Sequence, residues 1–144
     1  MRFIDANIFG HAYMKPRREL TPAEAQMKES AKQIINSLEK GEKMASTTVH
    51  ISEVLNILED NLGFKQSMAF LAWFIAAKNL TVFPIGITEY ESALNIARES
   101  LIGINDSLAV HIMRREGIGE IYSMDRHFNG LKDVVRIHAG NTVT

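Results

Sequence analysis

The sequence of 144 residues contains no cysteine. This absence excludes a disulfide framework, a thiolate nucleophile and a zinc site built on cysteine ligands. The longest apolar region, 68–77, is far shorter than the roughly 20 residues needed to cross a bilayer. The first carboxylate, Asp5, comes too early for the apolar segment of a signal peptide. We therefore expect a soluble, cytoplasmic protein without a membrane segment.

The sequence also has little net charge, −1 at pH 7, and so no overall basic character. This counts mildly against a role in binding nucleic acid, but it does not exclude one, because basic residues can cluster locally. The apolar content of 46% and the charged content of 23% are ordinary for a folded domain and unlike those of a disordered chain.

Strand and helix patterns alternate along the chain. The expected strands are 2–5, 43–45, 80–84, 120–123 and 134–137, and the expected helices are 22–40, 48–62, 64–78, 88–102 and 105–116. Alternating strands and helices predict an α/β domain with three layers, in which a mostly parallel sheet is covered by helices on both faces. No linker or repeat interrupts the pattern, so we expect a single domain over 1–144.

Some of these helices carry start signals. Thr21 and Glu24 have the spacing of a capping box around Pro22. Thr88 and Glu91 repeat that spacing, and Asn105 is expected to cap the helix that follows it. The 64–78 helix is apolar over most of its circumference, which predicts either deep burial or contact with a second subunit. A homodimer is therefore expected.

Two carboxylates lie at the ends of expected strands. Asp5 is the last residue of the 2–5 strand, and Asp125 follows the 120–123 strand by one residue. Open α/β sheets bind ligands beyond the carboxyl ends of their strands, so these two side chains are expected to face one crevice. Asp is also a favoured N-cap, and each could simply cap the next helix or turn.

Two further acids lie on expected helices. Asp106 shares a helix face with apolar residues such as Ala109 and Met113, where a carboxylate costs free energy unless it is paired or coordinates an ion. The dipole of its helix gives only partial relief. Glu53 has apolar neighbours one turn away on both sides, which predicts partial burial, although a solvent-facing Glu is the usual alternative.

Carboxylates that converge on one crevice repel each other unless a cation compensates their charge. Ligands that offer only oxygen select hard ions such as Mg²⁺ or Mn²⁺. These ions polarise a phosphoryl oxygen and activate water, which is the chemistry of phosphodiester hydrolysis. The five histidines have no zinc-binding spacing and are expected to be surface or hydrogen-bonded residues: His11, His50, His111, His127 and His138.

Taken together, these residues resemble the PIN-domain nucleases, and most closely the small toxins of prokaryotic VapBC toxin–antitoxin pairs. The segments that carry the resemblance follow one another along nearly the whole chain: Phe3-Ile4-Asp5-Ala6-Asn7, Ser46-Thr47-Thr48 through Glu53, Gly103–Ala109, and Ile121–Phe128. One departure is Ala6, where many family members carry Thr.

The resemblance implies a set of site residues. The catalytic residues and ligands of Mg²⁺ or Mn²⁺ would be Asp5, Glu53, Asp106 and Asp125. Asn7 and Ser123 would orient these ligands or the substrate. Phosphate groups of an RNA substrate would be contacted by Arg126 and by the basic cluster Lys15, Arg17 and Arg18, although a solvated loop explains this cluster about as well.

The resemblance also implies a function, a metal-dependent endoribonuclease that is held inactive by a cognate antitoxin inserted near the acids. A housekeeping RNA-processing nuclease of the same fold is the nearest alternative. A PIN-like or receiver-like module that binds metal and a partner without cleaving RNA is more remote. Receiver domains need a phospho-accepting Asp at the end of a central strand and a late Lys, and neither 43–45 nor 80–84 offers such an Asp.

Overall fold

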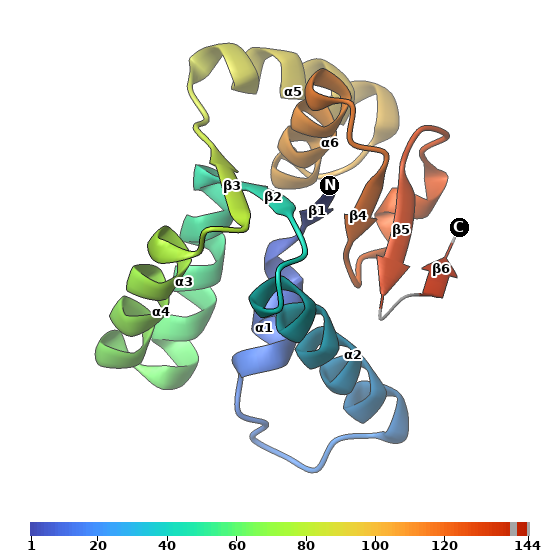
Figure 1. Ribbon diagram of the computed structural model, residues 1–144. Helices are drawn as coiled ribbons and strands as arrows, with labels where there is room; N and C mark the ends of the chain where they lie inside the picture. The colour runs from blue at the N-terminus through green and yellow to red at the C-terminus, as the bar shows by residue number, and fades with distance from the viewer. Residues whose placement is uncertain (139–140, 144) are drawn as a thin grey trace.

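The computed structural model describes residues 1–138 and the backbone of 141–143. Its sheet has the strand order β3-β2-β1-β4-β5-β6 (Figure 1). The strands are β1 (Arg2–Ile4), β2 (Met44–Thr47), β3 (Leu80–Phe83), β4 (Glu120–Tyr122), β5 (Val135–His138) and β6 (Asn141–Val143). Strands β1 to β5 pair in parallel, and β6 runs antiparallel to β5. The expected mostly parallel sheet is confirmed.

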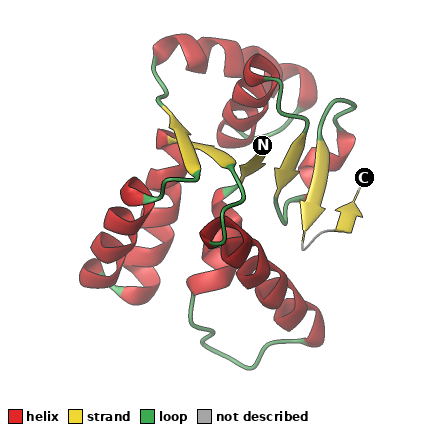
Figure 2. Ribbon diagram, viewed as in Figure 1, coloured by secondary structure: helices red, strands yellow, loops and turns green. Residues whose placement is uncertain are grey.

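Helices cover both faces of this sheet (Figure 2). They are α1 (Ala6–Tyr13), α2 (Pro22–Glu39), α3 (Thr48–Leu62), α4 (Phe64–Ala76), α5 (Ile87–Ser100), α6 (Ile104–Glu116) and the short 3₁₀ helix η1 (Arg126–Gly130). Strand side chains alternate between the two faces: Ile4 packs in the apolar cluster with α1 to α4, whereas Phe3 packs in the cluster with α5 and α6. The three-layer α/β/α architecture is confirmed.

The start of α2 follows its sequence signal. The Thr21 hydroxyl accepts a hydrogen bond from the Glu24 N–H at 3.2 Å, and the Glu24 carboxylate accepts one from the Thr21 N–H at 3.1 Å. At α3 the Thr47 hydroxyl accepts from the N–H of His50 at 3.2 Å. These side chains satisfy N–H groups that have no partner within the helix.

Two helix starts differ from expectation. Helix α5 begins at Ile87, and its capping contact runs from the Gly86 N–H to the Glu89 carboxylate at 2.9 Å, so Thr88 and Glu91 do not form the box. Helix α6 begins at Ile104, because the carbonyl of Gly103 accepts the first helical hydrogen bond, from the N–H of Ser107 at 2.9 Å. Asn105 therefore lies inside the first turn and is not the cap.

Three elements are absent from the sequence interpretation: α1, the 3₁₀ helix η1 and β6. Helix α1 follows Asp5 directly and buries Ile8 and Phe9 against α2 to α4. The expected last strand, 134–137, is followed by β6, which pairs with β5 at the edge of the sheet. These elements are short, and short elements have weak local signals. Helix α1 is held by packing against α2 to α4, and β6 by pairing with the preceding strand β5. No helix in the described part of the chain is long and apolar enough to cross a membrane.

Candidate active site

Asp5 and Asp125 both lie just beyond the carboxyl ends of neighbouring strands, β1 and β4. Asp5 is only 4% exposed. Its carboxylate accepts hydrogen bonds from the Ala6 N–H at 2.8 Å and from the Ser123 hydroxyl at 2.7 Å. Asp125 is half-buried, and its carboxylate accepts from the His127 N–H at 2.9 Å. Each Asp also caps the helix that follows it, α1 or η1. A capping role therefore does not prevent either carboxylate from belonging to a site at the carboxyl ends of the strands.

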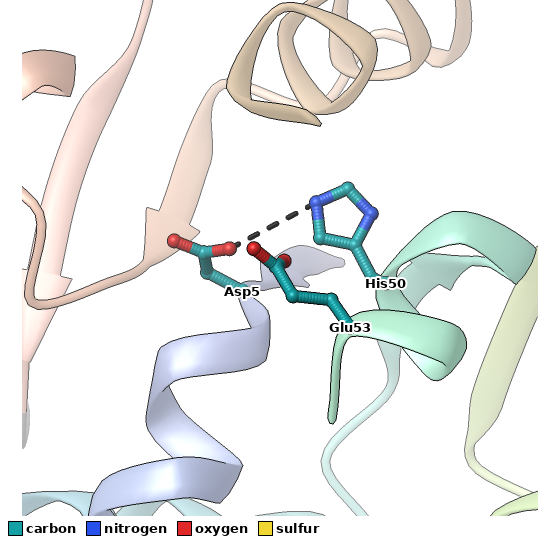
Figure 3. A group of neighbouring side chains, drawn as sticks. All are labelled: Asp5, His50 and Glu53. Atoms are coloured by element: carbon teal, nitrogen blue, oxygen red, sulfur yellow. Dashed lines mark ion pairs between the residues drawn. The ribbon is translucent and has the colours of Figure 1, made fainter. Parts of the chain in front are cut away.

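Asp5 faces two side chains from the first turns of α3, His50 and Glu53 (Figure 3). We call these three residues the inner group. Their potential ligand atoms all lie within 4.8 Å of one another, and the His50 Nε2 is 3.8 Å from the Asp5 Oδ1. Glu53 is half-buried and His50 is 1% exposed. The inner group therefore joins the end of β1 to one face of α3.

Asp106, Asp125 and His127 form an outer group, whose potential ligand atoms also lie within 4.8 Å of one another. Asp106 lies in the first turn of α6, where the helix dipole favours a negative charge. The His127 Nδ1 is 3.1 Å from the Asp125 carboxylate and 3.9 Å from that of Asp106. The His127 side chain is 67% exposed, so this group opens toward solvent.

The two groups are coupled electrostatically. The pKa of the Asp5 carboxyl is raised to about 7, mainly by burial and in addition by repulsion from Asp106 and Glu53, while the hydrogen bond from Ser123 opposes the shift. Burial also raises the pKa of Asp106 to about 6, with added repulsion from Asp125 and Glu53. Acids of each group thus disfavour the charge of acids in the other. Full ionisation of this site at neutral pH calls for a compensating cation.

Ser123 and Asn7 tie the two groups together. The Ser123 hydroxyl donates to Asp5 and accepts from the Asp125 N–H at 3.0 Å and from the Asn7 amide at 3.3 Å. The Asn7 side-chain carbonyl in turn accepts from the Met124 N–H at 3.2 Å. These contacts hold the loop after β4 against the start of α1, and so they set the position of Asp125 relative to Asp5.

The basic cluster lines a cleft of about 760 Å³ that Asn7 also lines. Lys15, Arg17 and Arg18 are all exposed there. Arg18 makes two hydrogen bonds to the Glu24 carboxylate, at 2.7 and 2.9 Å, so its charge is already paired. Arg126 is exposed at the start of η1.

His50 is the residue that the sequence interpretation missed. The expectation of a surface or fully hydrogen-bonded histidine is wrong for it, because its Nε2 has no hydrogen-bond partner in the described part of the chain. Burial lowers the pKa of His50 to about 4, so the ring is neutral. A usable signal was present in the sequence, since residues three apart share a helix face and His50 precedes Glu53 by three.

A model of the PIN domain family matches residues 2–134, nearly the whole chain. The chain belongs to the PIN domain family. A search of curated protein sequences found no match. The resemblance drawn from the four acidic segments is thus confirmed at the level of the family, and the receiver-like alternative is excluded.

Three solved structures that share the fold of this PIN domain are described in terms of toxins or VapBC proteins. The VapC20 toxin of Mycobacterium tuberculosis, described as cleaving the sarcin-ricin loop, has a TM-score of 0.74 at 18% identity, covering 96% of this chain and 99% of that one. A toxin–antitoxin complex from Klebsiella pneumoniae has a TM-score of 0.66 at 15% identity, covering 94% and 96%. VapBC2 from Rickettsia felis, bound to a promoter DNA fragment, has a TM-score of 0.63 at 14% identity, with the same coverage. At these identities the likeness concerns the fold.

Proposed function

We propose that this PIN domain is a metal-dependent endoribonuclease that hydrolyses RNA phosphodiester bonds. The observation that carries the proposal is the gathering of four carboxylates: Asp5 after β1, Asp125 after β4, Glu53 on α3 and Asp106 on α6. Glu53 and Asp106 repel Asp5, and Glu53 and Asp125 repel Asp106. Such a cluster costs free energy in a folded protein unless a cation is bound between its members. Membership of the PIN domain family also supports the proposed nuclease function.

The donor atoms fit a divalent cation. The four carboxylates offer the hard oxygen ligands that Mg²⁺ and Mn²⁺ prefer. The raised pKa values of Asp5 and Asp106 indicate a need for positive charge at this place. When bound, such an ion polarises a phosphoryl oxygen and makes nearby water more acidic.

The residues of the chain divide the remaining tasks. Asp5 is held rigidly by the Ala6 N–H and the Ser123 hydroxyl, so its oxygens are preorganised as ligands. Asn7 and Ser123 keep the inner and outer groups at a set separation. Arg126, Lys15 and Arg17 contact RNA phosphates beside the site, whereas Arg18 contributes less because Glu24 already pairs its charge.

The test compares RNA cleavage with Mg²⁺ or Mn²⁺ by the wild-type protein and by Asp5→Asn and Asp106→Asn. Each substitution keeps the shape of the side chain and removes one charge, and we expect cleavage to fall by at least about 100-fold. Glu59→Gln, an exposed change on α3 outside the basic cleft, is the control. Undiminished cleavage by both site variants would contradict the mechanism. A wild-type protein that binds metal and cleaves no RNA would favour the alternative of a binding module.

We further propose that the protein is the toxin of a toxin–antitoxin pair in the cytoplasm, and that a segment of the antitoxin blocks the acidic site. The support is the fold shared with proteins described as toxin–antitoxin complexes. Expression of the wild-type chain should arrest growth, and Asp5→Asn should not. A neighbouring reading frame for a small DNA-binding protein would favour this role over that of a housekeeping nuclease, and growth unaffected by active enzyme would favour the housekeeping role.

A homodimer is the expected assembly. Helix α4 buries Phe70 and Phe74 but leaves Phe64 and Ile75 each 72% exposed. Ile87, the first residue of α5, is also 74% exposed. Apolar faces of this kind are frequently covered by another subunit. Light scattering at micromolar concentration should give the mass of two chains, and Ile75→Lys should reduce it to one; the mass of a single chain for the wild type would overturn the dimer.

A further inference from the structure

The Nε2 of His50 is a buried polar atom without a partner. The side chain is 1% exposed, and Nε2 makes no hydrogen bond to any residue in the described part of the chain. Leaving a buried nitrogen unpartnered costs free energy, and an ordered water or a bound ion at such an atom would offset that cost. Two carboxylates, Asp5 and Glu53, face this atom (Figure 3).

The distances suit a shared ion better than a direct contact. Nε2 and the Asp5 Oδ1 are 3.8 Å apart, which is too long for a hydrogen bond. Two atoms that each lie roughly 2.0–2.2 Å from one ion are separated by about 3–4 Å. Potential ligand atoms of all three residues, one oxygen of Glu53 among them, lie within 4.8 Å of one another. The Asp5–His50 separation thus matches two ligands of one cation, with Glu53 near enough to act as a third.

The other ring nitrogen of His50 is placed as in metal-binding histidines. Its Nδ1 is 2.6 Å from the Thr47 hydroxyl, which is itself fixed because it caps α3. Histidine ligands usually have their second nitrogen hydrogen-bonded to an oxygen, and this contact fixes both the ring and its tautomer. The edge of the Phe3 ring packs against the imidazole, with centroids 5.1 Å apart. Nε2 is thereby aimed at the two carboxylates.

We propose that His50 supplies a nitrogen ligand to a divalent cation held by Asp5 and Glu53, and that the inner group consequently prefers Mn²⁺ to Mg²⁺. The inference rests on the proposed metal-dependent function. Imidazole nitrogen favours transition-metal ions, whereas a site of carboxylates and water is equally suited to Mg²⁺. The outer group also contains a histidine, His127, but its side chain is 67% exposed and not held in place by packing.

The test uses the metal-free, full-length protein with Mn²⁺ alone and without RNA. Electron spin-echo envelope modulation of the bound Mn²⁺ detects a directly coordinated nitrogen, and ¹⁵N-labelled histidine identifies the nitrogen as that of a histidine. We expect the nitrogen signal in the wild type and in His127→Gln, and its loss in His50→Gln. Calorimetry should show Mn²⁺ affinity of His50→Gln reduced at least about tenfold, and Mg²⁺ affinity by less than about threefold.

Every outcome decides the matter. If His50→Gln fails to fold, as judged by circular dichroism, the labelled wild type and His127→Gln still report whether a histidine other than His127 binds the ion. Mn²⁺ bound without nitrogen coupling in the wild type overturns this inference and leaves the proposed nuclease standing. A nitrogen signal that His127→Gln removes overturns it as well. Failure of both Mn²⁺ and Mg²⁺ to bind overturns the proposed metal site together with the inference.

Discussion

The inner and outer groups contain the same kinds of side chain in different surroundings. Each has two carboxylates and one histidine: Asp5, Glu53 and His50 in one, Asp106, Asp125 and His127 in the other. His50 is 1% exposed and the His127 side chain is 67% exposed. Asp5, after β1, is 4% exposed as a whole residue, whereas the side chain of Asp125, after β4, is 28% exposed. Burial strengthens every interaction of a charge, favourable or not, because water screens it less.

The difference suggests that the inner group is the tighter half of the site. A cation there replaces an unscreened repulsion with an attraction, whereas water already relieves part of the repulsion in the outer group. The outer group lies closer to solvent and is better placed to meet a large polymer such as RNA. Four predictions test this difference between the two groups.

The largest effect is expected for Glu53→Gln. The substitution removes one negative charge from the inner group and keeps the shape of the side chain, so cleavage of RNA should fall by at least about 100-fold. Glu59→Gln, an exposed change on the same helix, is the matched control and should cleave as the wild type does. Equal rates for the two variants would show that the inner group is not needed.

The second prediction concerns the pH dependence of stability without metal. The pKa of the Asp5 carboxyl is about 7 in the folded protein and 3.8 as its ordinary value, so the folded state binds this proton more tightly. The free energy of unfolding should therefore fall as the pH rises from about 4 to about 7, by roughly 1.4 kcal/mol for each pKa unit at most.

Urea unfolding of metal-free protein at pH 5 and pH 7.5 measures this dependence. Asp5→Asn should flatten it, and Asp125→Asn should change it less because that side chain is more exposed. Saturating Mg²⁺ or Mn²⁺ should restore the stability lost at pH 7.5, by about 2.7 kcal/mol at a hundredfold excess over Kd. A dependence of equal size in all three proteins would mean that burial of Asp5 does not control it.

The third prediction concerns the link between the groups. Ser123→Ala removes the hydrogen bond to Asp5 and leaves the Asp125 N–H and the Asn7 amide without this partner. Stability should fall by about 1–3 kcal/mol, and metal affinity by about 10–100-fold. Ser123→Thr, which keeps the hydroxyl, should recover metal affinity more than stability. Recovery of neither would show that the hydroxyl is not what matters at this position.

The smallest effect is expected for His127→Gln in the outer group. Its contact with Asp125 is solvent-exposed, and exposed charged pairs contribute only about 0.2–1 kcal/mol. Cleavage should fall by less than about fivefold, and stability should change by less than about 0.5 kcal/mol. A loss as large as that of Glu53→Gln would reverse the ranking of the two groups.

Local sequence patterns predicted much of the fold. The capping box at Thr21, the glycine after each of α3 and α6, and the short β-rich segments lie where the structure has them. The expected starts of α5 and α6 were too late because the sequence interpretation placed each cap at a polar side chain, Thr88 or Asn105, although a glycine precedes each helix. In the structure the N-cap positions are occupied by Gly86 and Gly103, whose carbonyls accept the first helical hydrogen bonds.

The positions of Asp5, Glu53, Asp106 and Asp125 on strand ends and helix faces were also readable from the sequence. Their division into two groups was not. Glu53 and Asp106 lie 53 residues apart, and the repulsion between them depends on the order β2-β1-β4 and on helices packed on opposite faces of the sheet. The pairing of Arg18 with Glu24 likewise depends on the path of the loop before α2, which brings the Arg18 side chain to the first turn of that helix.

The sequence by itself determined the α/β class, the mostly parallel sheet, the family and the residues at strand ends, because these follow from periodicity and from motifs read locally. Only the tertiary structure decided which acids meet, how deeply each is buried and that His50 joins Asp5 and Glu53. Burial and proximity are properties of segments brought together from different parts of the chain, and no local pattern specifies them. The sequence shows which side chains are carboxylates, whereas the free energy of ionising each of them depends on its surroundings in the folded protein.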